Sequence, residues 1–341
     1  MTTGIRGVDF GTHWDEVSWQ VNPVRDMVAS GLLLPRASIY PSVAEWLILL
    51  PAVPAGVRTA LRSGTKPRDA QAAMLAVLNR PDYLLTVRCL FIILSALAIV
   101  WVYAATLALR RPWWEALLAA CGLGLSWEYA YHARWVATDC LVVQFSALTL
   151  FFIAMFLRAG RRGWLYAAAV AAGLGTGAKF PGVVLVVPVA VAGALALSPS
   201  DWRRQLPRLI ALGATAAGAY LISTPATFMD PFTFAEQLAW ISEHYKNGHY
   251  MHTVSGPWQH LGLVFTYFAV SYFSPFEVAA VLLFAAVIGG AVVGARRSRQ
   301  AAAILIGFPI AFLVFFCFRY NAMIARNYLL TVPFLCVLMA G

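Results

Sequence analysis

Long apolar runs separated by short polar gaps recur along most of this chain. A helix that crosses a bilayer needs about 20 largely apolar residues, and several runs approach that length. They cover residues 89–109, 113–130, 140–157, 164–178, 180–197, 208–224, 276–294, 301–318 and 328–341. The pattern predicts an all-α, polytopic integral membrane protein with a helical bundle over residues 89–341.

Two further apolar stretches are ambiguous. The aromatic stretch 258–274 fits either a spanning helix or one that lies at the membrane interface. The stretch 41–57 contains prolines at both ends, and proline breaks a long straight helix. We expect 41–57 to be an amphipathic interfacial segment within a long external loop, residues 1–88.

Positive charge gathers in short clusters between the apolar runs. These clusters are at residues 110–111, 158–162, 203–208 and 296–299. Cytoplasmic loops are enriched in lysine and arginine, and all four clusters share one face if 164–197 crosses twice and 258–274 does not fully cross. That face should be cytoplasmic. Because the clusters account for the net charge of +10 as membrane anchors, the charge does not predict a nucleic-acid partner.

Composition agrees with a membrane protein. The chain is 61% hydrophobic and 12% charged, whereas soluble domains are about 25% charged. The five cysteines are dispersed without a CxxC pair, so neither a disulfide framework nor a zinc site is predicted. We expect one domain, residues 1–341, that lacks a first helix and a C-terminal part, because residue 1 falls in an external loop and the last run stops at Gly341.

The unusual polar residues fall on the face opposite the basic clusters. Asp15 and Glu16 are adjacent, so they cannot share one face of a regular helix or strand. A carboxylate there can act as general base or bind a cation. It can equally belong to a solvated loop or to a helix start, where acids suit the helix dipole.

Four more polar groups follow on that face. His132, Arg134 and Asp139 fit either a functional cluster or an interfacial Arg134–Asp139 ion pair. Lys179 lacks the Ser or Thr that follows GK in a phosphate loop, so it either holds an anion such as phosphate or snorkels to the interface. The remaining candidates are a polar external loop with Lys246 and His249, whose neighbouring histidines match no standard zinc spacing, and a turn with Arg319 and Arg326.

Several stretches together resemble the polytopic GT-C glycosyltransferases, in particular the group with protein O-mannosyltransferases and lipid A aminoarabinose transferases. They are HWDE, PVRDMVASGLLLP, YPSVAEWLILL, HARWVATD, GLGTGAKFPGVVLVVP, PATFMDPFTF and the RN before the last apolar run. The resemblance covers nearly the whole chain, and the order of the stretches agrees with the charge-based topology.

The resemblance implies transfer of a sugar from a polyprenyl-phosphate donor to a hydroxyl acceptor, with inversion, on the non-cytoplasmic face. Asp15 takes the place of the general base, and Glu16 and Asp139 assist it. Lys179 matches the lysine that contacts the lipid phosphate. Weaker phosphate-binding candidates are Arg88, Arg134, Arg319 and Arg326, and the substrate loop contributes Lys246 and His249.

The resemblance also leaves room for a divalent cation, Mg²⁺ or Mn²⁺, without naming its ligands. It places the protein in a bacterial inner membrane with the active site facing the periplasm, among membrane lipids, and the acceptor can be a lipid, a glycan or a protein. A transporter or flippase of lipid-linked substrates, without chemistry, is the alternative. A structural subunit without activity is a third reading.

Overall fold

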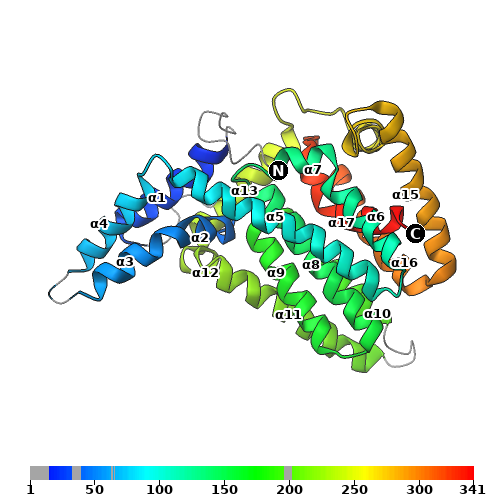
Figure 1. Ribbon diagram of the computed structural model, residues 1–341, viewed down its shortest axis with the longest axis horizontal. Coiled ribbons are helices and arrows are strands. Elements are labelled where there is room, and N and C mark those ends of the chain that lie inside the picture. The colour runs from blue at the N-terminus through cyan, green and yellow to red at the C-terminus, as the bar shows by residue number, and fades with distance from the viewer. Residues whose placement is uncertain (1–14, 33–39, 63, 65, 196–201) are drawn as a thin grey trace.

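The structure is a computed structural model that describes residues 15–32, 40–62, 64, 66–195 and 202–341, without the side chains of 202–205 (Figure 1). In these ranges every regular element is helical, and the only strand-like pairing is an isolated bridge between Thr253 and Ala322. Six helical segments of this part of the chain are long and apolar enough to span a membrane. The prediction of an all-α, polytopic membrane protein is confirmed.

The chain forms three groups of helices in sequence. An N-terminal arm contains η3 (Glu16–Val21), α1 (Asn22–Ser30), α2 (Val43–Leu49), η4 (Leu50–Ala52), α3 (Val53–Ala60) and α4 (Pro67–Leu78). The first part of the bundle contains α5 (Tyr83–Ala108), α6 (Trp113–Gly124), α7 (Trp127–His132), α8 (Thr138–Ala159), α9 (Gly163–Ala178), η5 (Phe180–Leu185), α10 (Val186–Leu195) and α11 (Trp202–Ser223). The last group contains α12 (Ala226–Met229), α13 (Pro231–Asn247), α14 (Pro257–Tyr267), η7 (Phe268–Tyr272), α15 (Glu277–Arg297), α16 (Arg299–Arg319), η8 (Ala325–Thr331) and α17 (Val332–Met339).

The N-terminal arm, blue to cyan in Figure 1, projects from one side of the bundle. It has a hydrophobic core of its own, which continues into α5. Side chains fasten α1 to α4, because Gln71 donates to the carbonyls of Val28 and Ala29 at 2.7 and 2.8 Å. Residues 43–60 reach the length of a span with a mean hydropathy of 1.2, against 2.4 for α5, so their interfacial position stays a prediction.

The basic clusters lie together at one end of the bundle. Arg297 at the end of α15 contacts both oxygens of Glu115 at the start of α6, at 2.7 and 2.9 Å. Gln300 donates to the carbonyl of Leu195, which joins the start of α16 to the end of α10. Arg162 and Arg208 line one small cavity between α9 and α11.

Two predictions about how the chain crosses the bundle agree with the structure. The chain turns back at Lys179, where the amide of Gly182 donates to the carbonyl of Lys179, so α9 and the helices η5 and α10 cross the bundle in opposite directions. The stretch 258–274 stays at the end opposite the basic clusters. There, His260 donates to the carbonyl of Tyr320 at 2.8 Å, and Ser126 donates to the carbonyl of Tyr272 at 3.1 Å.

Close packing of α9 against α11 requires a glycine at position 173. A Cβ on Gly173 would lie 2.2 Å from the carbonyl oxygen of Ala216 and 2.8 Å from the Cβ of Ala219. The two backbones therefore approach to a distance that leaves no room for a side chain.

We expect Gly173→Val to push α9 and α11 apart and to lower the midpoint of thermal unfolding, because overpacking costs about 1–3 kcal/mol. Gly218→Ala on α11 is the matched control, because a Cβ there meets nothing within 4 Å and alanine favours helix. Differential scanning fluorimetry in one detergent compares the two. An unchanged midpoint for Gly173→Val would contradict the packing described.

Candidate functional site

A cavity of about 670 Å³ opens at the end of the bundle opposite the basic clusters. The N-terminal arm, the turn after α9, α11, α13 and the segment from α16 to η8 all contribute to its wall, which is largely apolar and aromatic. Its ionisable and phenolic residues are Asp15, Tyr40, Lys179, Tyr220, His244, Tyr245, His249, Tyr320 and Arg326. The cavity is therefore mainly apolar, and its few polar side chains come from distant parts of the sequence.

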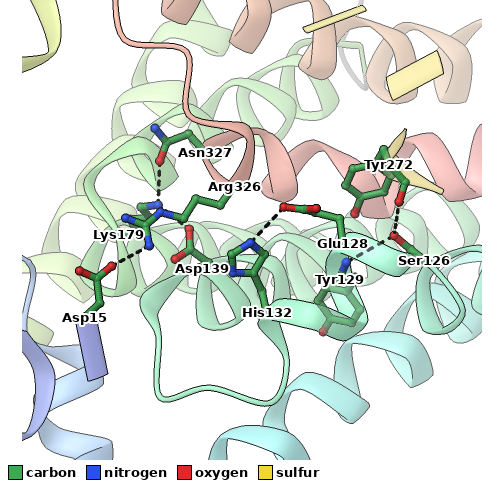
Figure 2. A network of polar contacts seen from close by, with 10 residues as sticks. All are labelled: Asp15, Ser126, Glu128, Tyr129, His132, Asp139, Lys179, Tyr272, Arg326 and Asn327. Carbon is green, nitrogen blue, oxygen red and sulfur yellow. Dashed lines mark hydrogen bonds and ion pairs between the residues drawn. The ribbon is translucent and has the colours of Figure 1, made fainter. Parts of the chain in front are cut away.

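Asp15 and Arg326 form an ion pair at the cavity wall (Figure 2). Asp15 immediately precedes η3, and its Oδ2 lies 2.6 Å from a guanidinium nitrogen of Arg326 in η8. Both side chains are largely buried, with 4% of Asp15 and 12% of Arg326 exposed. Burial of a charge in an apolar wall is costly unless it is paired, so this contact fixes the first carboxylate of the arm against the bundle.

Lys179 is the second charged group of the cavity. Its Nζ donates to Oδ1 of Asp139 at 2.6 Å and to Oδ1 of Asn327 at 2.8 Å. The backbone of Lys179 is extended between α9 and η5, and this break in the helix turns the side chain toward the first turn of α8. Asp139 lies behind Lys179 and does not line the cavity. An ammonium has three donors, and these two contacts account for two of them.

Tyr40 lies on the same wall, close to both ion pairs. Burial raises the pKa of Tyr40 well above its usual value, and the nearby carboxylate of Asp15 raises it further. The phenol therefore stays neutral at any physiological pH and keeps its proton as a hydrogen-bond donor.

Glu16 and Arg88 do not face the cavity. Arg88 on α5 makes a two-pronged contact with the carboxylate of Glu16, at 2.8 and 2.6 Å. The same carboxylate accepts from the amide of Val136 at 2.9 Å. Both side chains are almost completely buried, and neither lines the cavity. The expectation that Arg88 contacts a donor phosphate does not fit, because this pair fastens the arm to α5 and to the loop before α8. Any assistance that Glu16 gives to the base is then by positioning the segment that carries Asp15.

Three other predicted cations also lie away from the cavity lining. The guanidinium of Arg134 stacks over the rings of Tyr131 and Trp135, at 4.6 and 4.7 Å. Asp139 pairs with Lys179, so the alternative Arg134–Asp139 ion pair is wrong. Arg319 and Lys246 complete this group. Arg319 is exposed, and Lys246 pairs with Glu243 at 3.5 Å.

Of the two residues predicted for the substrate loop, only His249 lines the cavity. It lies beside His244, with the two ring centroids 5.1 Å apart. His244 in turn stacks on Trp240, with a centroid distance of 5.5 Å. The loop is attached to the bundle by backbone hydrogen bonds, from Val254 to Asn321 and from Met323 to His252, each 2.8 Å long.

The described residues do not offer a metal centre. No group of three His, Cys, Asp or Glu side chains within them could hold a metal ion. The two carboxylates nearest the cavity are each neutralised by a cation, Asp15 by Arg326 and Asp139 by Lys179. This donor set does not suit Mg²⁺ or Mn²⁺, which favour several uncompensated oxygen ligands, and the divalent cation expected from the sequence has no support here.

Sequence reasoning missed several residues of this site. Asn327 was visible only as part of the RN pair, and nothing local indicated that its carbonyl would accept from Lys179. Tyr40 and the aromatic wall of α13 were also missed. The prolines after Tyr40 and before α13 signalled turns, but not the direction in which the side chains would point.

The family model for dolichyl-phosphate-mannose-protein mannosyltransferases matches residues 71–228. A crystal structure of ArnT from Cupriavidus metallidurans bound to undecaprenyl phosphate superposes with a TM-score of 0.59 at 18% identity, over 94% of this chain and 54% of that one. The apo state of ArnT from the same organism gives a TM-score of 0.52 at 19% identity, over 95% and 54%. No curated protein sequence matches significantly.

These matches confirm the resemblance to GT-C-type glycosyltransferases that the motifs indicated. The fold of this chain is the polytopic, all-α fold that ArnT has. The chain spans about half the length of the solved structures it matches.

We expect Arg88→Met to destabilise the fold by about 3–5 kcal/mol, because it leaves the carboxylate of Glu16 buried without its counter-ion. The control is Arg80→Met, which breaks an exposed pair with Asp82 and should cost less than about 1 kcal/mol. Thermal unfolding of the two purified variants checks the difference. If Arg88→Met kept the wild-type midpoint and lost only donor binding, the assignment of this pair to the scaffold would be wrong.

Proposed function

We propose that this chain transfers a sugar from a polyprenyl-phosphate donor to the hydroxyl of an acceptor, as a GT-C-type glycosyltransferase. The observation that carries the proposal is the meeting of Asp15, Lys179 and Arg326 at one largely apolar cavity. One carboxylate and two cations are the groups that such a transfer needs, and the apolar wall suits a lipid-linked donor. The GT-C-like fold supports the same reaction class.

Asp15 serves as the general base in this proposal. A hydroxyl is a weak nucleophile, and a carboxylate within hydrogen-bond reach accelerates its attack by taking the proton. The acceptor oxygen then bonds to the anomeric carbon while the bond from that carbon to the phosphate oxygen breaks. The electron pair leaves with the lipid phosphate, the proton stays on Asp15, and a single displacement inverts the anomeric centre.

Lys179 and Arg326 stabilise the leaving phosphate. The phosphate gains negative charge as the bond breaks, and fixed cations aimed at that charge lower the barrier. Arg326 is well placed for this role, since a guanidinium carries five donors and can bridge Asp15 and a phosphate. Such a bridge would hold the base and the leaving phosphate close to each other at one end of the cavity.

Asp139 and Asn327 are positioning residues rather than catalytic ones. They hold two of the three N–H groups of Lys179, which leaves the third donor for the phosphate. Their own side chains lie outside the cavity lining. Asp139 thus assists the reaction through Lys179, by positioning its ammonium group.

The four basic clusters at the opposite end of the bundle favour a cytoplasmic position for that end, which puts the cavity on the periplasmic face of a bacterial inner membrane. Trp240, His244 and His249 also line the cavity, and we assign the acceptor to this part of its wall. The partners are then a polyprenyl-phosphate sugar, membrane lipids and an acceptor that carries a hydroxyl.

A transporter or flippase of lipid-linked substrates is the competing function. It would expose the same residues alternately to both sides of the membrane. Single cysteines at positions 15 and 249, labelled from each side of sealed vesicles, separate the two. Labelling from one side supports the enzyme, and labelling from both sides supports transport.

We expect Asp15→Asn to reduce sugar transfer by about 10²–10⁴-fold, the usual contribution of a general base, while donor binding is retained. The measurement is transfer of radiolabelled sugar from a polyprenyl-phosphate donor by protein reconstituted in lipid. The control is Asp26→Asn, an exposed carboxylate of the same segment, which should keep the wild-type rate. Wild-type transfer by Asp15→Asn would exclude Asp15 as the base.

We expect the double variant Asp139→Asn/Lys179→Met to weaken binding of the polyprenyl-phosphate donor by about tenfold or more, because a charge-assisted hydrogen bond contributes about 1.5–3 kcal/mol. Removing both members of the pair avoids a buried, unpaired carboxylate. Lys66→Met, at the exposed start of α4, is the control. Equal donor affinity of the double variant and wild type, measured by competition with polyprenyl phosphate, would contradict a phosphate role for Lys179.

A further inference from the structure

A second, smaller cavity lies at the basic end of the bundle, away from the proposed active site. Its volume is about 290 Å³, and α8, α9, α10 and α11 enclose it. Arg162, at the start of α9, and Arg208, near the start of α11, both line it, and Tyr166 stands beside them. Neither the donor nor the acceptor of the proposed reaction uses this cavity.

The two arginines carry charge that the described part of the chain does not neutralise. Every ion pair found among the described residues involves other cations, and neither Arg162 nor Arg208 hydrogen-bonds to a side chain within that part. Arg158 and Arg161 add further charge close by in sequence, and the positive end of the α9 dipole points the same way. The cavity is therefore a site of positive potential.

The rest of the cavity is apolar, which restricts what can fill it. Phe156, Leu165 and Leu212 are buried side chains that line it from α8, α9 and α11. On the neighbouring outer surface, Val170 and Ile210 expose 40% and 61% of their side chains, as expected where helices face lipid. A ligand with an anionic head and an apolar body matches both parts of this surface.

We propose that this cavity binds the phosphate headgroup of an anionic phospholipid from the leaflet at the basic end. Guanidinium groups match phosphate oxygens in a two-pronged geometry, and basic pockets between membrane helices on the cytoplasmic side bind such headgroups. A volume slightly below that of typical ligand sites, about 300–1,000 Å³, suits a phosphoglycerol head. The bound lipid would link α9 to α11, and both helices also contribute residues to the wall of the active-site cavity.

Native mass spectrometry of the detergent-purified full chain tests this proposal. The probes are phosphatidylglycerol, phosphatidylcholine and inorganic phosphate, each added separately. The test variant is Arg162→Gln/Arg208→Gln. The control is Arg296→Gln/Arg299→Gln, which removes the same charge from exposed positions of the same end, outside the cavity. Thermal unfolding is measured with and without each probe.

Wild type and the control should retain phosphatidylglycerol in preference to phosphatidylcholine, and the lipid should raise the unfolding midpoint. The test variant should bind phosphatidylglycerol about fivefold more weakly for each arginine removed, and about 25-fold more weakly in total. Its midpoint without added lipid should match that of the control, which shows that it folds.

Three results would overturn the proposal. The first is equal phosphatidylglycerol affinity of the test variant and the control, which would reduce the arginines to general membrane anchors. The second is equal retention of phosphatidylcholine by wild type, which would remove the role of charge. The third is saturable binding of inorganic phosphate that phosphatidylglycerol does not displace, which would identify a site for a soluble anion.

Discussion

The hydrogen-bonded ammonium group of Lys179 is the contact on which the arrangement of the cavity depends. It joins the start of α8, the break between α9 and η5, and the start of η8, through Asp139 and Asn327. Three segments that the sequence separates widely are held there by one charge. Because a buried charge is tolerated only when it is paired, the position of each segment is tied to the other two, and Arg326 is placed beside its neighbour Asn327.

Asp15 and Glu16 of the N-terminal arm are buried, and each is likewise paired with a cation. Asp15 and Glu16 are adjacent, yet one reaches Arg326 at the cavity and the other reaches Arg88 inside the fold. The divergence follows from the backbone, since adjacent side chains in a helical turn leave its axis in different directions. Glu16 therefore anchors the segment inside the fold, and Asp15 is presented to the cavity.

Properties that depend on local sequence were predictable, and long-range partnerships were not. Hydropathy and the basic clusters were sufficient to predict the reversal at Lys179, the common end of the four clusters and the position of 258–274. They could not predict that Glu16 would meet Arg88, 72 positions away, or that Lys179 would meet Asn327, 148 positions away. Such contacts arise only when helices pack, and for that reason Arg134 was an equally reasonable partner for Asp139 before the fold was known.

The way α13 is attached to the bundle separates substitutions in the aromatic wall of the cavity from substitutions of its charged groups. The groups that would carry the chemistry come from the arm and the bundle, whereas Trp240 and His244 come from a helix whose following loop is joined to the bundle by backbone hydrogen bonds. Backbone contacts are indifferent to side-chain identity. Tyr245 of α13 reaches the Lys179 network, because its hydroxyl accepts from Asn327 at 3.5 Å. Among the described residues, Trp240 and His244 make no such contact, so substitutions at these two positions can accumulate and change what the cavity recognises while its ion pairs are kept.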